Sequence, residues 1–133
     1  MSTQQQVSIA QDFFQKCFHG DLTEAVKLLD PKVRYHVPGS HEAAGTFEGP
    51  ESVAEHVSNL LKITCGTVDV TQWEDWLVGI DNVAALVQMR VQRTSRVFNF
   101  RSVYIVELSP EDKIRRIDLF FDDEAAVDRI FSW

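Results

Sequence analysis

Two long stretches of alternating apolar and polar residues in the second half of the chain constrain its fold most strongly. In residues 83–92, valine, alanine and methionine occupy every odd position, and residues 97–108 continue the alternation after a turn. A period of two is typical of β-strands with one buried face. Residues 67–80 and 113–121 are also rich in β-branched and aromatic residues, so the sequence predicts a meander of four antiparallel strands. Residues 124–133 are expected to form a short helix or a trailing segment.

The first half of the chain follows the period of a helix instead. Residues 7–18 and 22–29 place apolar residues three and four positions apart, and Gly20 separates the two segments. A third helix is expected to begin at Gly49-Pro50, because proline is favoured at the first helical position. Helices followed by a strand meander predict one α+β domain over residues 1–133, in which about three helices pack on the concave face of a curved antiparallel sheet.

Both faces of the predicted long strands carry apolar residues. On the strand at 97–108, Val103 and Ile105 point opposite to Phe100 and Tyr104. One layer of helices covers only one face of a sheet, and exposed apolar surface of this kind often marks an interface. We therefore expect a symmetric homodimer through the outer face of the sheet.

Charge and composition argue against several classes of function. The net charge is −7, whereas a protein that binds nucleic acid needs clustered lysines and arginines to neutralise phosphates, so no nucleic acid is expected. No apolar run approaches the roughly 20 residues that span a membrane, so no membrane partner is expected. The first residues lack the features of a secretory signal, and the expected compartment is the cytoplasm. Cys17 and Cys65 form no CxxC pair and are expected to stay reduced.

The segment between the predicted strand at 33–37 and the helix at Pro50 is where such a scaffold usually presents its chemistry. His36, at the strand end, is the leading candidate for a general base, because an imidazole suits proton abstraction next to a carbonyl. The alternative is a histidine hydrogen-bonded inside an apolar wall. His41 is a weaker candidate whose side chain is expected in solvent, and His56 is expected to pack at a helix boundary. No carboxylate or thiol stands at ligand spacing beside them, so no metal is expected.

Tyr104 is the second catalytic candidate, since its hydroxyl could donate to a developing oxyanion; the alternative is a core tyrosine with a backbone partner. Asp122 is a weak candidate, because strand alternation puts it outside the pocket unless a bulge reverses the parity. An aromatic pocket wall suits a flat hydrophobic ligand such as a polyketide or a steroid. The residues expected to bind it are Phe13, Phe47, Trp73, Val87, Met89, Phe100, Ile117, Leu119 and Phe121.

Three segments together resemble one known family. They are His19-Gly20-Asp21-Leu22, then His36-Val37-Pro38-Gly39 with Ala44-Gly45-Thr46-Phe47-Glu48-Gly49, and finally Lys113-Ile114 with Phe121-Asp122. With them, nearly the whole chain resembles the SnoaL-like and ketosteroid-isomerase-like branch of the nuclear transport factor 2-like superfamily. The resemblance implies a cone with an inner pocket, whose open end is lined by the first helix, the loop after His36 and the inner faces of the long strands. Members of this superfamily include isomerases, polyketide cyclases, dehydratases, epoxide hydrolases and domains with no catalysis.

The resemblance also implies where functional residues fall. The carboxylate base of the ketosteroid isomerases falls on His36, their oxyanion-hole tyrosine on Phe13, and their protonated aspartate on Tyr104. The aspartate of the epoxide-hydrolase branch falls on Leu119.

Three hypotheses stay open. The first is an enzyme without a cofactor that acts on a small hydrophobic carbonyl compound, with His36 as base and Tyr104 steadying the enolate. The second is a non-catalytic dimeric domain that binds a small molecule or a protein, which the missing hydroxyl at Phe13 and the apolar Leu119 favour. The third is a metal-assisted enzyme that uses the histidines.

Overall fold

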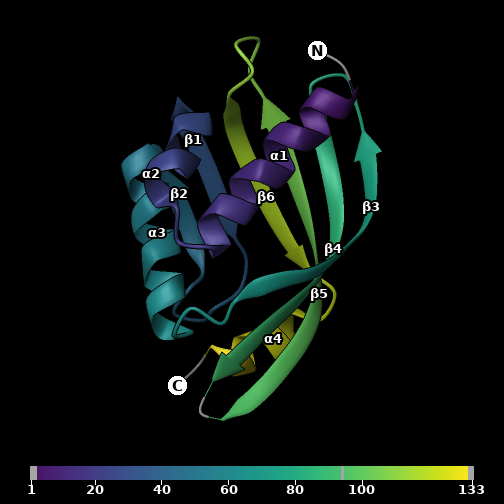
Figure 1. Cartoon of the computed structure of the whole chain (residues 1–133). Helices are drawn as coiled ribbons and strands as arrows, with labels where there is room; N and C mark the ends of the chain where they lie inside the picture. Colours follow the sequence, from purple (N-terminus) through teal and green to yellow (C-terminus); the bar gives the residue numbers. More distant parts are fainter. Residues whose placement is uncertain (1–2, 94, 132–133) are drawn as a thin grey trace.

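The computed structural model describes residues 3–93 and 95–131 (Figure 1). Its helices are α1 (Thr3–Phe18), α2 (Leu22–Ala25), α3 (Pro50–Ile63) and α4 (Glu124–Ile130), with a short 3-10 helix at Val26–Leu28. Its strands are β1 (Leu29–Val37), β2 (Gly45–Glu48), β3 (Asp69–Val78), β4 (Asn82–Arg93), β5 (Arg96–Leu108) and β6 (Ile114–Phe121). Of the predicted segment 124–133, residues 132 and 133 lie outside the described residues.

The strands form one curved sheet in the order β2-β1-β6-β5-β4-β3. The predicted meander of β3 to β6 is confirmed, because each of these strands pairs antiparallel with the next. β1 differs from the expectation of a purely antiparallel sheet: it pairs parallel with β6, with Tyr35 opposite Ile117. Parallel neighbours need a long crossover, which the chain between β1 and β6 provides.

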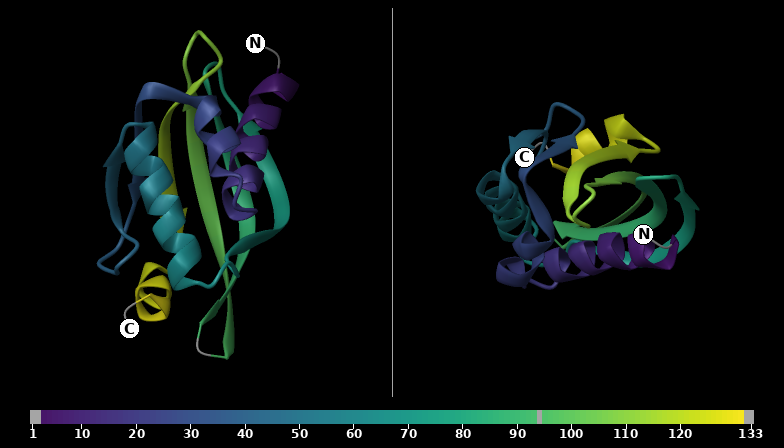
Figure 2. Two further views of the ribbon diagram at one scale, coloured as in Figure 1. Left: turned by 60° about the vertical axis from the view of Figure 1, so that its left-hand side comes forward. Right: turned by 90° about the horizontal axis from the view of Figure 1, so that it is seen from above.

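The helices lie on the concave side of the sheet, as predicted, and the sheet curls around α1 (Figures 1 and 2). The apolar stripe of α1 buries Phe13 and Phe14 completely, and the Phe14 ring lies 4.2 Å from that of Tyr104 on β5. Burial of each phenylalanine contributes about 1.5–3 kcal/mol. α3 begins at Pro50, where Gly49 takes a positive φ of 88°, and packs along β1 and β2. The α+β cone is thus confirmed, and its interior is closed on the helix side by α1 and α3.

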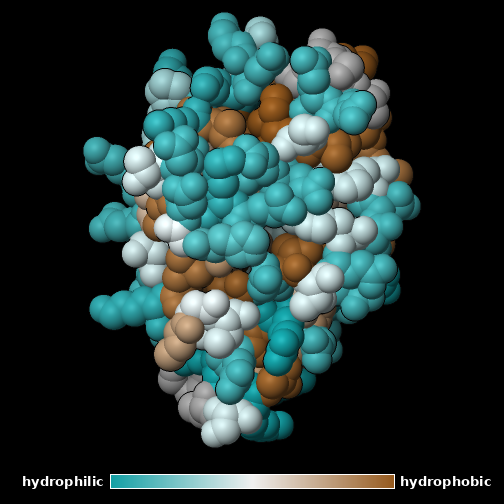
Figure 3. Space-filling view, viewed as in Figure 1, coloured by the Kyte–Doolittle hydropathy of each residue, from teal (hydrophilic) through white to brown (hydrophobic). Residues whose placement is uncertain are grey.

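Polar and apolar residues both appear on the surface of the molecule. Figure 3 shows that the helix-covered side is largely hydrophilic, with smaller apolar areas between the polar ones. On the outer face of the sheet, Val103 and Ile105 are half-buried and Phe120 is 51% exposed. Within the described residues, no helix is both long enough and apolar enough to cross a bilayer.

Candidate functional site

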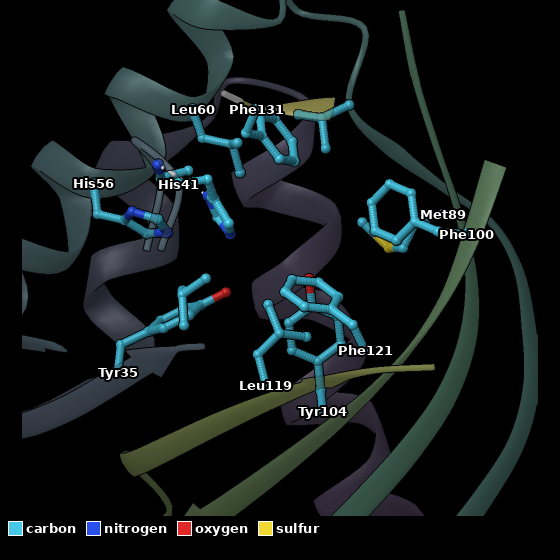
Figure 4. A pocket seen from close by; sticks show the side chains of 13 residues that line it. Tyr35, His41, His56, Leu60, Met89, Phe100, Tyr104, Leu119, Phe121 and Phe131 are labelled. Atoms are coloured by element: carbon cyan, nitrogen blue, oxygen red, sulfur yellow. Dashed lines mark hydrogen bonds between the residues drawn. The ribbon is translucent and has the colours of Figure 1, made fainter. Parts of the chain in front are cut away.

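A small cavity lies inside the cone, between the sheet, α3 and the end of α4 (Figure 4). It is lined by Tyr35, Val37, His41, Ala43, His56, Leu60, Val68, Met89, Phe100, Tyr104, Leu119, Phe121 and Phe131. The space open to the centre of a water-sized sphere is about 30 Å³. That is room for one or two water molecules. Its lining includes no aspartate, glutamate, lysine or arginine among the described residues.

Two buried tyrosines supply hydroxyl groups to this cavity. Alternation turns Tyr35 of β1 and Tyr104 of β5 inward, and Figure 4 shows both hydroxyls directed into the cavity. Burial raises the pKa of both phenols, and each phenol also influences the pKa of the other. Both therefore stay protonated at neutral pH and can donate a hydrogen bond. Sequence reasoning found Tyr104 but missed Tyr35.

His41 lies against the cavity rather than in solvent, which corrects the expectation for its side chain. The side chain is only 1% exposed, and its ring lies 5.2 Å from that of Phe131 and 6.4 Å from that of Phe121. The Ala43 N–H donates to Nδ1 at 3.1 Å, so the neutral ring carries its proton on Nε2. Burial lowers the pKa of His41, against the opposing effect of Asp128, whose Oδ1 lies 4.0 Å from Nε2.

His56 of α3 is a second buried histidine in the cavity wall. Its ring stacks on Phe47 with 4.2 Å between centroids, and it lies 5.3 Å from the ring of Tyr35. Burial lowers the pKa of His56 to about 4, so this imidazole is neutral at physiological pH. On its other side, His56 borders a surface groove that Glu55 and Lys62 also line. The sequence reading placed His56 in boundary packing and missed that it reaches the cavity.

The structure corrects the predicted placement of His36. Its neighbours Tyr35 and Val37 point into the cavity, so His36 points to the opposite face of β1. There its Nδ1 lies 2.8 Å from the hydroxyl of Thr46 on β2. The structure therefore does not bring His36 and Tyr104 together.

The predicted ligand-binding residues divide into three groups. Those that line the cavity are Met89, Phe100, Leu119 and Phe121. Those that are buried in the surrounding core without lining it are Phe13, Val87 and Ile117. Those that are half-buried elsewhere are Phe47, on the surface groove, and Trp73, which packs on Phe14 and Trp76.

Asp122 is exposed and outside the cavity, where its carboxylate accepts a hydrogen bond from the Arg101 N–H at 3.3 Å. Alternation along β6 predicted this side, and no bulge reverses it there, because Ser102 of β5 still pairs with Phe121. Among the described residues, no group of three or more histidines, cysteines or carboxylates could hold a metal ion.

Comparisons with known proteins agree with this fold. A family model described as "SnoaL-like domain" matches residues 10–117. Uncharacterized proteins of Mycobacterium bovis and Mycobacterium tuberculosis are each 29% identical to this chain over 133 residues, covering 99% of it and 100% of their own length. These relatives extend the likeness over almost the whole chain.

Solved structures resemble the chain over a similar extent. A protein of unknown function with a cystatin-like fold from Xanthomonas campestris has a TM-score of 0.86 at 22% identity, covering 96% of this chain and 98% of its own. TerC, co-crystallized with polyporic acid, has a TM-score of 0.81 at 13% identity, covering 96% and 97%. The epoxide hydrolase/cyclase-like enzyme SalBIII, of pyran ring formation in salinomycin, has a TM-score of 0.73 at 18% identity, covering 89% and 91%. At these identities the likeness shows the fold alone.

Proposed function

Because the chain belongs to the SnoaL-like family, we propose that it binds a small hydrophobic carbonyl compound in the cavity and catalyses acid–base chemistry of the isomerase, cyclase or dehydratase type. One observation carries the proposal: two protonated tyrosine hydroxyls and two neutral histidines border the same apolar cavity. Polar groups that converge in an apolar pocket are the usual features of a small-molecule site.

The absence of charge from the cavity lining restricts the ligand. Transfer of a charged ligand from water into such a lining costs several kcal/mol, because none of its described residues carries a compensating charge. A neutral carbonyl compound avoids that cost and can accept a hydrogen bond from Tyr104. As an enolate forms, negative charge develops on the carbonyl oxygen, and the Tyr104 hydroxyl stabilises it while Tyr35 supports Tyr104.

We assign the role of general base to His56 instead of the predicted His36. His56 makes no hydrogen bond to another described residue, and its neutral ring has a lone pair free to accept a proton. The Nδ1 lone pair of His41 is already taken by the Ala43 N–H. In an isomerisation, His56 removes the proton next to the carbonyl, the electron pair moves to the oxygen, and the protonated His56 returns the proton at another carbon.

A non-catalytic binding domain is the second candidate. It is favoured by the small volume of about 30 Å³ and by the absence of a carboxylate from the cavity lining among the described residues. Each candidate has a structural neighbour of its kind: TerC was co-crystallized with polyporic acid, and SalBIII is an epoxide hydrolase/cyclase-like enzyme.

We also propose that the protein is a homodimer, joined through the outer face of the sheet. Half-buried Val103 and Ile105 and the 51% exposed Phe120 share that face, which the helices do not cover. The same face of a second copy, related by a two-fold axis, would cover these apolar side chains.

Turnover and binding of carbonyl-containing polyketide-like compounds test the proposal, with Tyr104→Phe and His56→Gln as variants and His36→Ala as the control. If the proposal holds, loss of the hydroxyl donor lowers kcat by about 10²–10³-fold. His56→Gln is expected to lower turnover as well, while His36→Ala, outside the cavity, leaves it unchanged. Equal turnover in wild type and Tyr104→Phe would contradict the oxyanion role. Binding without turnover in every protein would favour the non-catalytic domain.

A further inference from the structure

The end of α4 closes one side of the cavity. Phe131, which follows α4, is 4% exposed and contributes its ring to the cavity lining, next to the ring of His41. Val127 and Ile130 of the same helix are buried but do not line the cavity. Phe131, directly after the helix, therefore places its ring at the edge of the cavity.

The first contact that holds α4 in place is made by Asp128 with the loop after β1. Its Oδ1 accepts the Ser40 N–H at 3.0 Å, and the His41 Nε2 lies 4.0 Å from the same oxygen. Gly39 makes this contact possible: its φ is +111°, and a Cβ at that position would lie 2.5 Å from Asp128 Oδ1. The carboxylate is thus seated in a bend of the loop.

The second contact is made by Arg93, at the end of β4. Its guanidinium donates to Glu42 of the same loop at 2.9 Å and to the Ile130 carbonyl of α4 at 3.3 Å. It also lies 5.8 Å from the centroid of the Phe131 ring. Arg93 therefore joins β4, the loop and α4 at one end of the molecule, where Figure 1 shows α4 beside the end of β4 and the start of β5.

A ring compound does not fit the cavity in this arrangement, because about 30 Å³ holds only one or two waters. The strands in the wall are fixed by ladder hydrogen bonds to their neighbours. In α4, by contrast, the N–H groups of Val127 and Phe131 bond within the helix, to Asp123 and Val127. The side chains of Asp128 and Arg93 supply polar contacts to the loop and to β4. Two helices, α3 and α4, can move without breaking the sheet, and α4 is the shorter, with 7 residues against 14.

We propose that α4 is a movable cover over the cavity, latched by Asp128 and Arg93, and that Phe131 is the plug that limits the size of the ligand. The proposal rests on the function proposed above, since it takes the cavity to be the ligand site. With the plug displaced, the space gained borders His41, whose ring lies 5.2 Å from that of Phe131, and adjoins the cavity that Phe100 and Phe121 also line. A flat, uncharged ring compound with a carbonyl group fits these surroundings.

Native-state hydrogen exchange tests the cover without any ligand. The variant Arg93→Met removes one latch. Arg115→Met is the control, because it also removes an arginine that pairs with carboxylates, Asp81 at 3.5 Å and Glu107 at 3.3 Å, but away from α4. We expect the amides of Val127 and Phe131 to exchange at least tenfold faster in Arg93→Met than in Arg115→Met, while the amides of β5 are unchanged. Equal rates in the two variants would overturn the cover.

Binding of acetophenone, followed by NMR titration, tests the plug. Phe131→Ala is compared with Ile130→Ala, which also truncates a buried residue of α4 but leaves the cavity lining intact. Because a cavity opened by truncation binds small aromatic compounds, we expect at least tenfold tighter binding by Phe131→Ala. Measurable but equal affinity in the two variants overturns the plug. Fast exchange in Arg93→Met with no acetophenone binding to any variant supports the cover and contradicts the proposed ligand class.

Discussion

The buried histidine of α3 makes the stability of the protein depend on pH in a calculable way. Burial lowers the pKa of His56 to about 4 in the folded state, from 6.5 in its absence. Between these two values the unfolded chain binds more protons at this position than the folded one. The free energy of unfolding therefore falls as the pH falls from 6.5 towards 4, and the full contribution is present only above pH 6.5.

The size of the effect follows from the shift. Each pKa unit corresponds to about 1.4 kcal/mol, so the difference between 6.5 and about 4 makes up to about 3 kcal/mol of pH-dependent stability. That is a large part of the roughly 5–15 kcal/mol by which a domain is stable. The lowered pKa of His41 acts in the same direction, so the wild type is expected to lose somewhat more than His56 alone accounts for.

Replacement of His56 by glutamine isolates this contribution. Urea unfolding, followed by tryptophan fluorescence at several pH values from 7.5 to 4.5, gives the free energy of unfolding of both proteins. Carboxylates titrate in both proteins, so their effect cancels when the two free energies of unfolding are subtracted. The difference in free energy of unfolding between wild type and His56→Gln is therefore expected to change by about 2–3 kcal/mol over this range. An NMR titration of the imidazole gives the pKa directly. A difference that does not change with pH, or a His56 that titrates near 6.5, would refute a buried neutral imidazole in the cavity wall.

Three further predictions concern the tyrosines, the outer face and the thiols. Tyr35→Phe and Tyr104→Phe are each expected to destabilise the protein, and the double variant by about 1 kcal/mol less than their sum, because the two buried phenols influence each other. Additive effects in urea unfolding would show that the hydroxyls are not coupled. Val103→Asp places a charge in the proposed dimer interface and is expected to give a monomer in light scattering, whereas an unchanged dimer would remove this face as the interface. Cys65 is exposed, whereas Cys17 is buried and its pKa is raised to about 12 by that burial. A thiol reagent is therefore expected to modify Cys65 in the native protein and Cys17 only after unfolding. Rapid modification of both cysteines would contradict the burial of Cys17.

The long strands could be predicted from the sequence, because their alternation is long enough to determine which residues face the core and which face outward. Over β4, all five odd positions from Val83 to Val91 are buried, as predicted. On β5 the same reasoning correctly turned Tyr104 and Phe100 towards the helices. A shift by one residue would have moved every apolar side chain of these strands to the other face, so the pattern itself excludes it.

The histidines were harder to place, for two different reasons. His41 is buried because the bend at Gly39 folds the loop back against α4, and no local pattern encodes a contact with a helix 87 residues further along the chain. For His56 a signal was present: it lies three residues after Val53 and four before Leu60, within the buried stripe of α3. A polar residue within an apolar stripe faces the interior with the rest of the stripe.

In β1, successive side chains point to opposite faces of the sheet, so a difference of one position decides which group enters the site. The family resemblance places a catalytic carboxylate at the position of His36, but Val33, Tyr35 and Val37 form the apolar face of β1, and this face is the one turned inward. The cavity therefore receives a phenol from this strand in place of a base. With Tyr104, His41 and His56, every titratable group in its lining is neutral at physiological pH, since burial raises the pKa of the phenols and lowers that of the imidazoles. A lining of this kind selects for neutral ligands, and protonation of His56 below its pKa of about 4 would place a strongly disfavoured charge inside it.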